Sequence, residues 1–304
     1  MEKLLKGFDL KIVMAFAAVY IIWGTTYLAI KIGLENMSPF IMAFFRYLIA
    51  GVLLLSWGLV KRSVVLDKHM LKNMLLGAFM LTLGQGVLFW AEQYLSSGLT
   101  AVFISTLPIC YILVDRRNWK GYFQSKLTLA SILIGFFGIF LLFNGQTDAP
   151  SQHAANMTVI ASFVVIGSCI CWAIGSLYYK NNMSSGSLFT NVAWQLIGGA
   201  IACFFIGFTT GEWAGFRIEE IDSKSWTAVF YLSIAGSIVA FTASYYLLAN
   251  RPAAVVGTYA YVNPIIAVLL GCLLAEEVIS VIQIIGIAII LMAAYLANKV
   301  KMEM

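Results

Sequence analysis

Ten long apolar stretches fill this chain almost from end to end, and the sixth repeats the first. The first contains Trp23 and Lys31, and the sixth contains Trp172 and Lys180, so in both a Trp and a Lys stand eight residues apart. Five stretches separate the start of one copy from the start of the next. Because five is odd, successive crossings of a membrane give the two copies opposite directions. A duplicated, inverted helix bundle is typical of membrane transporters that alternate between two faces.

The composition places the chain in a lipid bilayer. Hydrophobic residues make up 61% of its 304 positions and charged residues only 11%, whereas soluble domains carry about 25% charged residues. So few charges cannot cover the surface of a soluble protein of this size, so the remaining apolar surface faces lipid. The net charge of +5 does not form a basic patch interleaved with polar surface, which argues against nucleic acid as a partner.

The apolar stretches predict the fold class directly. A helix crosses the hydrocarbon core with about 20 apolar residues. We expect an all-α membrane protein of ten transmembrane helices, arranged as two inverted five-helix repeats at residues 1–145 and 146–304. The predicted spans are 11–32, 38–60, 70–91, 97–114, 126–144, 157–180, 187–209, 225–249, 252–274 and 279–298.

Lysine and arginine predict the orientation. With the N-terminus inside, the inner segments hold 15 of the 19 basic residues, and the outer segments hold Lys31, Arg217 and Lys224. Cytoplasmic loops of membrane proteins carry this excess. We therefore expect a protein of the bacterial cytoplasmic (inner) membrane with both termini in the cytoplasm.

Helical spacing gathers aromatic and polar side chains on shared faces. In the first helix, Trp23 and Tyr27 stand one turn apart, and Trp172 and Ser176 do so in the sixth. An unpaired amide in hydrocarbon costs about 2–7 kcal/mol, so such faces turn to a cavity or to a neighbouring helix; some aromatics will instead lie at the membrane interface. The candidate substrate-binding residues are Trp23, Tyr27, Gln85, Phe89, Ser105, Trp172, Ser176, Tyr245, Tyr259 and Asn263.

Four charged residues are candidates for gating. Arg46 lies well inside the second helix, and Lys31, Glu92 and Lys180 lie at helix ends. A buried charge points inward to a partner, and Glu92 or helix carbonyl ends could serve Arg46. Two interpretations of Arg46 stay open: a structural pin, or a contact to a substrate carboxylate or gate. No Asp or Glu lies at mid-membrane, so facilitated diffusion and coupling through Glu92 are both possible.

Two prolines interrupt matching helices. Pro108 lies in the fourth helix and Pro264 in the ninth, and each removes a backbone donor and favours a kink. We interpret the pair as hinges; the alternative is that the kinks only improve packing.

Short motifs recur in a fixed order along the chain: Trp23 to Thr26, Lys31, Pro39, Phe45, Arg46, Pro108, Pro264, Ala275 to Glu277 and Gln283 to Gly286. Together these motifs resemble the drug/metabolite transporter superfamily, and more narrowly its ten-helix EamA-type exporters. The resemblance covers essentially the whole chain and implies efflux of small metabolites, often amino acids, through a central cavity. The first repeat departs from the family pattern, because a basic turn over residues 115–120 replaces an acidic one.

Motifs for catalysis are absent from the sequence. There is no Gly-Lys dipeptide for a nucleotide-binding loop and no H-E-x-x-H zinc motif. We therefore expect a transporter of a small molecule, not an enzyme, with no cofactor. The alternatives are a transporter of another cargo, such as a nucleobase or drug-like compound, and a membrane enzyme or receptor on the same scaffold. The sequence is compatible with a monomer and with a homodimer, and it leaves the substrate, the coupling ion and the transport direction open.

Overall fold

The structure, a computed structural model, describes residues 9–62, 68–95, 97–143, 152–182, 187–275 and 280–298. These residues form helices and turns and no strand, as the sequence predicts. Of the described helices, six are long and apolar enough to cross a membrane: Leu10–Leu34, Pro39–Val60, His69–Ala91, Asn156–Asn181, Leu188–Thr209 and Ser223–Asn250.

The helices follow one another with short connections. Those before residue 144 are α2 (Leu10–Leu34), α3 (Pro39–Val60), α4 (Lys68–Leu81), the π-helix η1 (Thr82–Gly86), α5 (Val87–Ala91), α6 (Ser97–Ile104), α7 (Leu107–Val114), η2 (Arg116–Asn118), α8 (Trp119–Gln124) and α9 (Lys126–Phe143). Those after it are α10 (Gln152–Asn181), α11 (Leu188–Thr209), η3 (Glu212–Gly215), η4 (Ile218–Glu220), α12 (Ser223–Tyr231), the π-helix η5 (Leu232–Ala240), α13 (Phe241–Asn250), α14 (Ala253–Val256), α15 (Tyr259–Ala275) and α16 (Val281–Asn298).

Four of the ten predicted spans correspond to shorter or interrupted helices. The predicted fourth span is divided into α6 and α7 by a turn at residues 105–106, and the ninth into α14 and α15 by a turn at 257–258. The fifth and tenth spans correspond to α9 and α16. The shorter apolar segments are Lys126–Gly138, Ala253–Ile266 and Ile284–Ala293.

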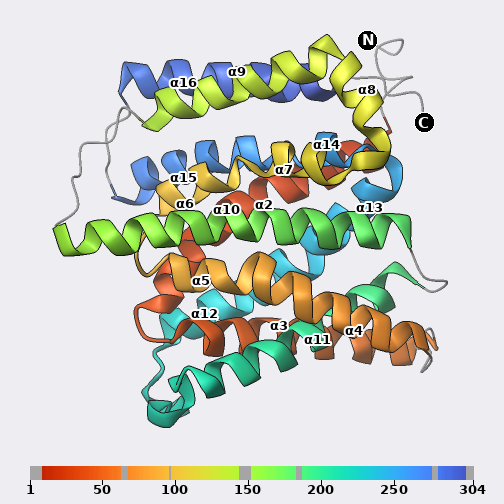
Figure 1. Cartoon of the computed structure of the whole chain (residues 1–304). Coiled ribbons are helices and arrows are strands. Elements are labelled where there is room, and N and C mark those ends of the chain that lie inside the picture. Colours follow the sequence, from red (N-terminus) through yellow and green to blue (C-terminus); the bar gives the residue numbers. More distant parts are fainter. Residues whose placement is uncertain are drawn as a thin grey trace.

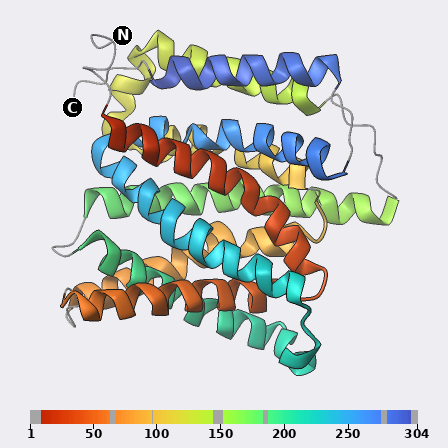
Figure 2. The same ribbon diagram turned by 180° about the vertical axis from the view of Figure 1, so that it is seen from behind.

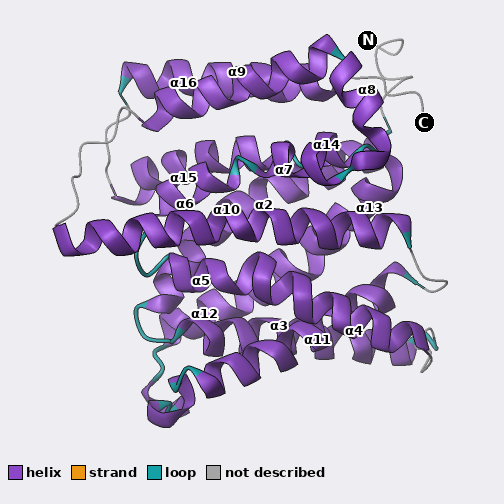
Figure 3. Ribbon diagram, in the orientation of Figure 1, coloured by secondary structure: helices purple, strands orange, loops and turns teal. Residues whose placement is uncertain are grey.

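The helices run roughly parallel across the molecule, and Figures 1 and 2 show the same layering from both sides. Helices α9 and α16 lie side by side at one edge, and α3, α4 and α11 form the opposite edge, with α2 and α10 between them. Helix α2 begins and α16 ends on the right in Figure 1, and we call this the terminal end. The 210–222 connection lies at the other end, the distal end. The all-helical layout is evident in Figure 3.

Glycines allow the closest helix contact. A methyl group at Gly77 of α4 would lie 1.9 Å from the carbonyl oxygen of Gln195, and one at Gly198 of α11 would lie 2.0 Å from that of Met74. The two backbones therefore touch at reciprocal positions, as small residues permit in membrane helix pairs. This contact fixes α4 against α11 in the terminal half of the bundle.

Two π-helices lie inside two of the long spans, His69–Ala91 and Ser223–Asn250. Segment η1 follows α4, and η5 follows α12. A π-turn shifts the hydrogen-bond pattern of a helix and frequently occurs at functional sites. Both π-helices reach the cavity or its neighbours, as described below.

Tryptophans near helix ends are expected at the membrane interface, and one of three such residues packs inside instead. Trp57 and Trp119 are exposed, in agreement with an interfacial belt. Trp213 is instead half-buried: its Nε1 donates to the Phe204 carbonyl at 3.1 Å, and its ring packs on Phe44 at 5.5 Å. The 210–222 connection folds back onto α3 and α11, so Trp213 contributes to packing.

Candidate functional site

An internal cavity lies between the two parts of the chain. Its empty volume is about 510 Å³, a value that includes open solvent. Its lining comes from α2, α3, η1, α5, α6, α7, α10 and α15, so residues far apart in the sequence surround it. The lining residues are Trp23, Thr26, Tyr27, Ile30, Arg46, Gly84, Gln85, Leu88, Phe89, Ile104, Leu107, Ser168, Cys169, Trp172, Tyr259 and Asn263.

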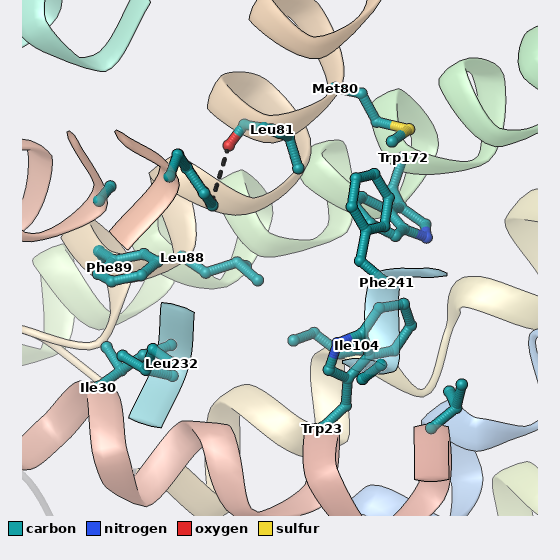
Figure 4. Packing of buried hydrophobic residues seen from close by; sticks show 14 of the residues in the cluster. Trp23, Ile30, Met80, Leu81, Leu88, Phe89, Ile104, Trp172, Leu232 and Phe241 are labelled. Carbon is teal, nitrogen blue, oxygen red and sulfur yellow. Dashed lines mark hydrogen bonds between the residues drawn. The ribbon is translucent and has the colours of Figure 1, made fainter. Parts of the chain in front are cut away.

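Aromatic rings form one wall of this cavity. The centroid of the Trp23 ring lies 5.6 Å from that of Trp172 and 4.6 Å from that of Tyr259, and both contacts are edge-on. Trp172 also packs against Phe241 at 5.7 Å, and Figure 4 shows Met80 next to these two rings. Edge-to-face aromatic pairs contribute about 0.5–1.5 kcal/mol beyond their buried area. The two tryptophans of the repeated motif therefore meet at the cavity.

The π-helix η5 positions two cavity side chains. The indole Nε1 of Trp23 donates to the carbonyl of Gly236 at 3.1 Å, and Nε of Arg46 donates to Oγ of Ser237 at 2.8 Å. A methyl group at Gly236 would lie 3.1 Å from Nη2 of Arg46 and 3.3 Å from Cγ2 of Thr26. The glycine therefore lets the guanidinium lie directly against the helix.

Arg46 is a buried cation in the cavity wall. Its side chain is 3% exposed and lies over the rings of Tyr47 and Phe89, at 5.3 and 5.7 Å from their centroids. Cation–π contacts of this kind stabilise a desolvated cation. Among the described residues, no carboxylate lies within 4.0 Å of it, so Arg46 has a hydroxyl and two rings as partners but no counter-ion.

Glu92, which follows α5 directly, is not the partner of Arg46 in this conformation. Its side chain is 6% exposed, and neither carboxyl oxygen has a hydrogen-bond partner. Burial raises the pKa of the Glu92 carboxyl well above its ordinary value, and Lys31 and Arg46 act in the opposite direction.

Asn263 presents an unpaired acceptor. It is fully buried, its Nδ2 donates to the Tyr27 hydroxyl at 3.2 Å, and its Oδ1 has no partner. Both residues line the cavity. A buried unpaired carbonyl oxygen is costly, and a donor group on a bound molecule would satisfy it.

Three predicted binding residues do not line the cavity. Ser105 is buried at the turn between α6 and α7. Ser176 Oγ donates to the Met80 sulfur at 3.8 Å, and the Tyr245 ring stacks on Tyr179 at 3.8 Å with an interplanar angle of 9°. These three side chains pack between helices instead. The predicted residues that do line it are Trp23, Tyr27, Gln85, Phe89, Trp172, Tyr259 and Asn263.

Tyr245 belongs to a buried polar group that the sequence analysis missed. Tyr245 donates to Oε1 of Gln195 at 2.5 Å, Gln195 Nε2 donates to Oδ1 of Asn73 at 3.0 Å, and Asn73 Nδ2 donates to Oδ1 of Asn191 at 3.2 Å. We call these four residues the amide cluster. It joins α4, α11 and α13 toward the terminal end. The rule that picked out Gln85 and Asn263, an amide within an apolar stretch, applies equally to Gln195.

The remaining charged and proline candidates lie away from the cavity. Lys31 is exposed, and Lys180 donates to the carbonyl of Arg251 at 2.7 Å. Pro108 lies in the first turn of α7, directly after the turn at 105–106. Pro264 lies inside α15, six residues after the turn at 257–258. Both prolines are buried.

The sequence analysis also missed several lining residues. Ser168 and Cys169 precede Trp172 by four and three residues, so the face that contains Trp172 extends to them. Thr26 follows Trp23 by three residues and lies on the same side of α2. Extending each aromatic face by one turn in both directions would have found all three.

Comparison with known proteins identifies the relatives of this chain. The sequence profile of the EamA-like transporter family matches residues 10–144 and again 159–299. The "Uncharacterized inner membrane transporter YedA" of Escherichia coli (strain K12) is 35% identical over 295 residues, which cover 94% of this chain and 90% of that protein. The "Uncharacterized transporter YoaV" of Bacillus subtilis (strain 168) is 23% identical, covering 92% and 94%. A solved crystal structure has the same fold, with a TM-score of 0.72, 17% identity, and coverage of 94% and 96%.

Proposed function

The chain belongs to the EamA-like transporter family of the drug/metabolite transporter superfamily, and from this premise we propose that it is a secondary exporter of small metabolites. The proposed substrates are amino acids or related compounds, moved by alternating access through the central cavity. The family and the names of the relatives indicate transport.

One observation carries the proposal. Trp23 and Trp172 occupy equivalent positions in the repeated sequence motif, and their rings meet at 5.6 Å in the wall of an internal cavity. Alternating access needs a binding site at the junction of two related halves. A cavity whose walls come from both halves, with one tryptophan from each, fits that requirement.

Two inverted five-helix halves, residues 1–145 and 146–304, are part of this proposal. The family profile matches twice, over 10–144 and 159–299. Helix pairs that correspond in the predicted repeats also pack together, α3 with α11 and α9 with α16. The turn between α6 and α7 has its counterpart between α14 and α15. These correspondences support ten spans related by inversion.

The proposed orientation has both termini in the cytoplasm, in the inner membrane. Single cysteines at Glu219, near the distal end, and at Lys120, near the terminal end, test it, because both positions are exposed. We expect an impermeant thiol reagent to label position 219 in intact cells and position 120 only after lysis. The reverse pattern would invert the orientation. The predicted outer position Asp148 lies outside the described residues.

The transport function is tested with purified protein in liposomes. We expect labelled amino acids to exchange across these liposomes faster than across protein-free ones, and excess unlabelled substrate to compete. A panel that includes a nucleobase and a cationic drug distinguishes the other cargoes. Exchange of none of these compounds would contradict the proposal.

A further inference from the structure

The lining of the cavity carries a positive charge that no negative charge balances. Arg46 is the one charged residue in the lining given above, and its Nε is committed to Ser237. Its two terminal nitrogens form no hydrogen bond with the described residues. A cation this deeply buried is costly without a partner. A bound anionic group would supply the missing counter-ion.

The free part of Arg46 favours one kind of anion. The two terminal N–H groups of a guanidinium form a planar fork that matches two carboxylate oxygens. A carboxylate carries one negative charge, which balances one guanidinium. A phosphate dianion would leave net negative charge in a cavity with an aromatic wall, where nothing in the lining compensates for it. The site is therefore matched to a carboxylate.

A second polar group in the cavity wall also lacks a partner. Oδ1 of Asn263 can only accept a hydrogen bond, and the Tyr27 hydroxyl already contacts the Nδ2 side of the same amide. The rings of Trp23, Trp172 and Tyr259 belong to the same lining. The cavity thus offers a cation, an acceptor and an apolar aromatic surface.

We propose that Arg46 binds a carboxylate of the substrate, with Asn263 Oδ1 accepting a hydrogen bond from a donor on the same molecule. The substrate class is a small carboxylate-bearing metabolite with an apolar or aromatic body. This inference rests on the proposed transport function and adds a selection rule to it: compounds that lack the carboxylate are rejected.

Three labelled probes test the rule in liposomes that contain the full-length protein. Phenylalanine carries a carboxylate and an ammonium, phenylpyruvate carries the carboxylate alone, and phenethylamine carries the ammonium alone. We expect exchange of both carboxylates, with phenethylamine at least about tenfold slower, since a buried polar site rejects a ligand that leaves it unpaired. Phenylpyruvate should exchange more slowly than phenylalanine, because it gives Asn263 no ammonium.

Two variants connect the rule to Arg46. Arg46→Gln should lower phenylalanine exchange by about tenfold or more, the usual scale for a lost charge-assisted pair. We expect phenylalanine to raise the unfolding temperature of the unchanged protein and to have no such effect on Arg46→Gln. Because Arg46→Gln also removes the buried bond to Ser237, Gly236→Ala provides an independent test. Its methyl group would lie 3.1 Å from Nη2, so the guanidinium must shift by a few tenths of an ångström without any loss of charge, and we expect a several-fold higher KM for phenylalanine. Gly167→Ala, where a methyl group meets no atom within 4 Å, is the matched control and should change nothing.

Each outcome decides between the rule and the function. Exchange of phenethylamine at a rate equal to phenylalanine, or a folded Arg46→Gln protein with unchanged phenylalanine exchange, would overturn the carboxylate rule and leave transport intact. Exchange of none of the three probes, with exchange of a nucleobase or drug, would overturn the rule together with the amino-acid assignment. An unchanged KM in Gly236→Ala would remove Arg46 from the site.

Discussion

The cavity and the amide cluster are both buried and both contain amides, yet they differ in how their polar groups are paired. In the cluster, the amides of Asn73 and Gln195 bond to each other and to neighbouring helices. In the cavity, Oδ1 of Asn263 has no partner and Arg46 has no counter-ion among the described residues. Fully paired polar groups stabilise a helix interface, whereas a buried unpaired group needs an explanation, which the proposed substrate would supply at the cavity.

The two regions also lie at different depths. Asn73 and Gly84 are eleven residues apart along one helical span, which is about 16 Å at 1.5 Å per residue. The cluster therefore lies on the terminal side of the cavity. We interpret the structure as the conformation that is sealed toward the terminal end, with the cluster as the seal. The predictions below separate a binding region from a sealing region.

The largest expected effect is on the cavity. Trp172→Ala removes the ring that contacts Trp23 and Phe241, so amino-acid exchange should fall by at least about tenfold while the protein still inserts, since aromatic anchors dominate binding sites. Exchange per folded molecule in liposomes measures it.

The control for Trp172→Ala is Trp213→Ala. Trp213 packs on α3 and α11 and bonds to the Phe204 carbonyl, so its loss should lower the unfolding temperature but leave exchange per folded molecule unchanged. Equal loss of exchange in both variants, or failed insertion of Trp172→Ala alone, would assign Trp172 to packing.

The next largest expected effect is on the contact between α4 and α11 beside the amide cluster. In Gly77→Ala, a methyl group would lie 1.9 Å from a backbone oxygen of α11, and the helices must separate. Overpacking of this kind costs about 1–3 kcal/mol. We expect a lower unfolding temperature. We also expect the amide cluster to open, which is measured as greater access of a reagent to the cavity from the terminal side. A Gly77→Ala protein as stable as Gly167→Ala would show that the α4–α11 contact adapts freely.

A milder change acts on the seal alone. Tyr245→Phe removes only the hydroxyl that donates to Gln195 and leaves the stack on Tyr179 in place. An acceptor left unpaired in a buried site costs about 1–3 kcal/mol. We expect the cavity to become more accessible from the terminal side, while phenylalanine affinity changes little. A loss of affinity without a change in accessibility would make Tyr245 a binding residue, as the sequence first indicated.

The sequence predicted the residues of the cavity lining better than those of the amide cluster, for a physical reason. Helical periodicity identifies which residues share a face, and Trp23 and Tyr27, which it placed on one face, both line the cavity. It carries no information about depth along the helix, so Tyr245 and Ser176 were assigned to the cavity although they lie on the terminal side of it.

The positions of the π-helices could not be predicted from helical periodicity either. A π-turn shifts the register by a fraction of a turn, and no residue type in Leu232–Ala240 marks it. The partner of Arg46, Ser237, lies in that segment. For this reason the sequence identified Arg46 as a buried charge that needs a partner but could name only Glu92 or helix carbonyls.

The smallest expected effects concern the hinges, and the structure makes the two prolines unequal. Pro108 directly follows the turn at residues 105–106, whereas Pro264 lies within a continuous helix. Alanine at position 108 allows α6 and α7 to join, because it restores a backbone donor. We expect Pro108→Ala and Pro264→Ala both to slow exchange a few-fold and to retain binding of phenylalanine, with the larger effect at position 108.

The direction of the two effects distinguishes hinges from packing features. The two helices belong to halves that the proposed fold relates by inversion, so straightening one favours access from one side and straightening the other favours access from the opposite side. A cysteine at Ser105, beside the first turn, reports this through thiol labelling in a chain whose five native cysteines are replaced. Ser105 is buried in the sealed conformation, so labelling from either side marks a population shift. If both variants raise labelling from the same side, or neither does while exchange is normal, Pro108 and Pro264 serve packing, and the seal at the amide cluster opens by another motion.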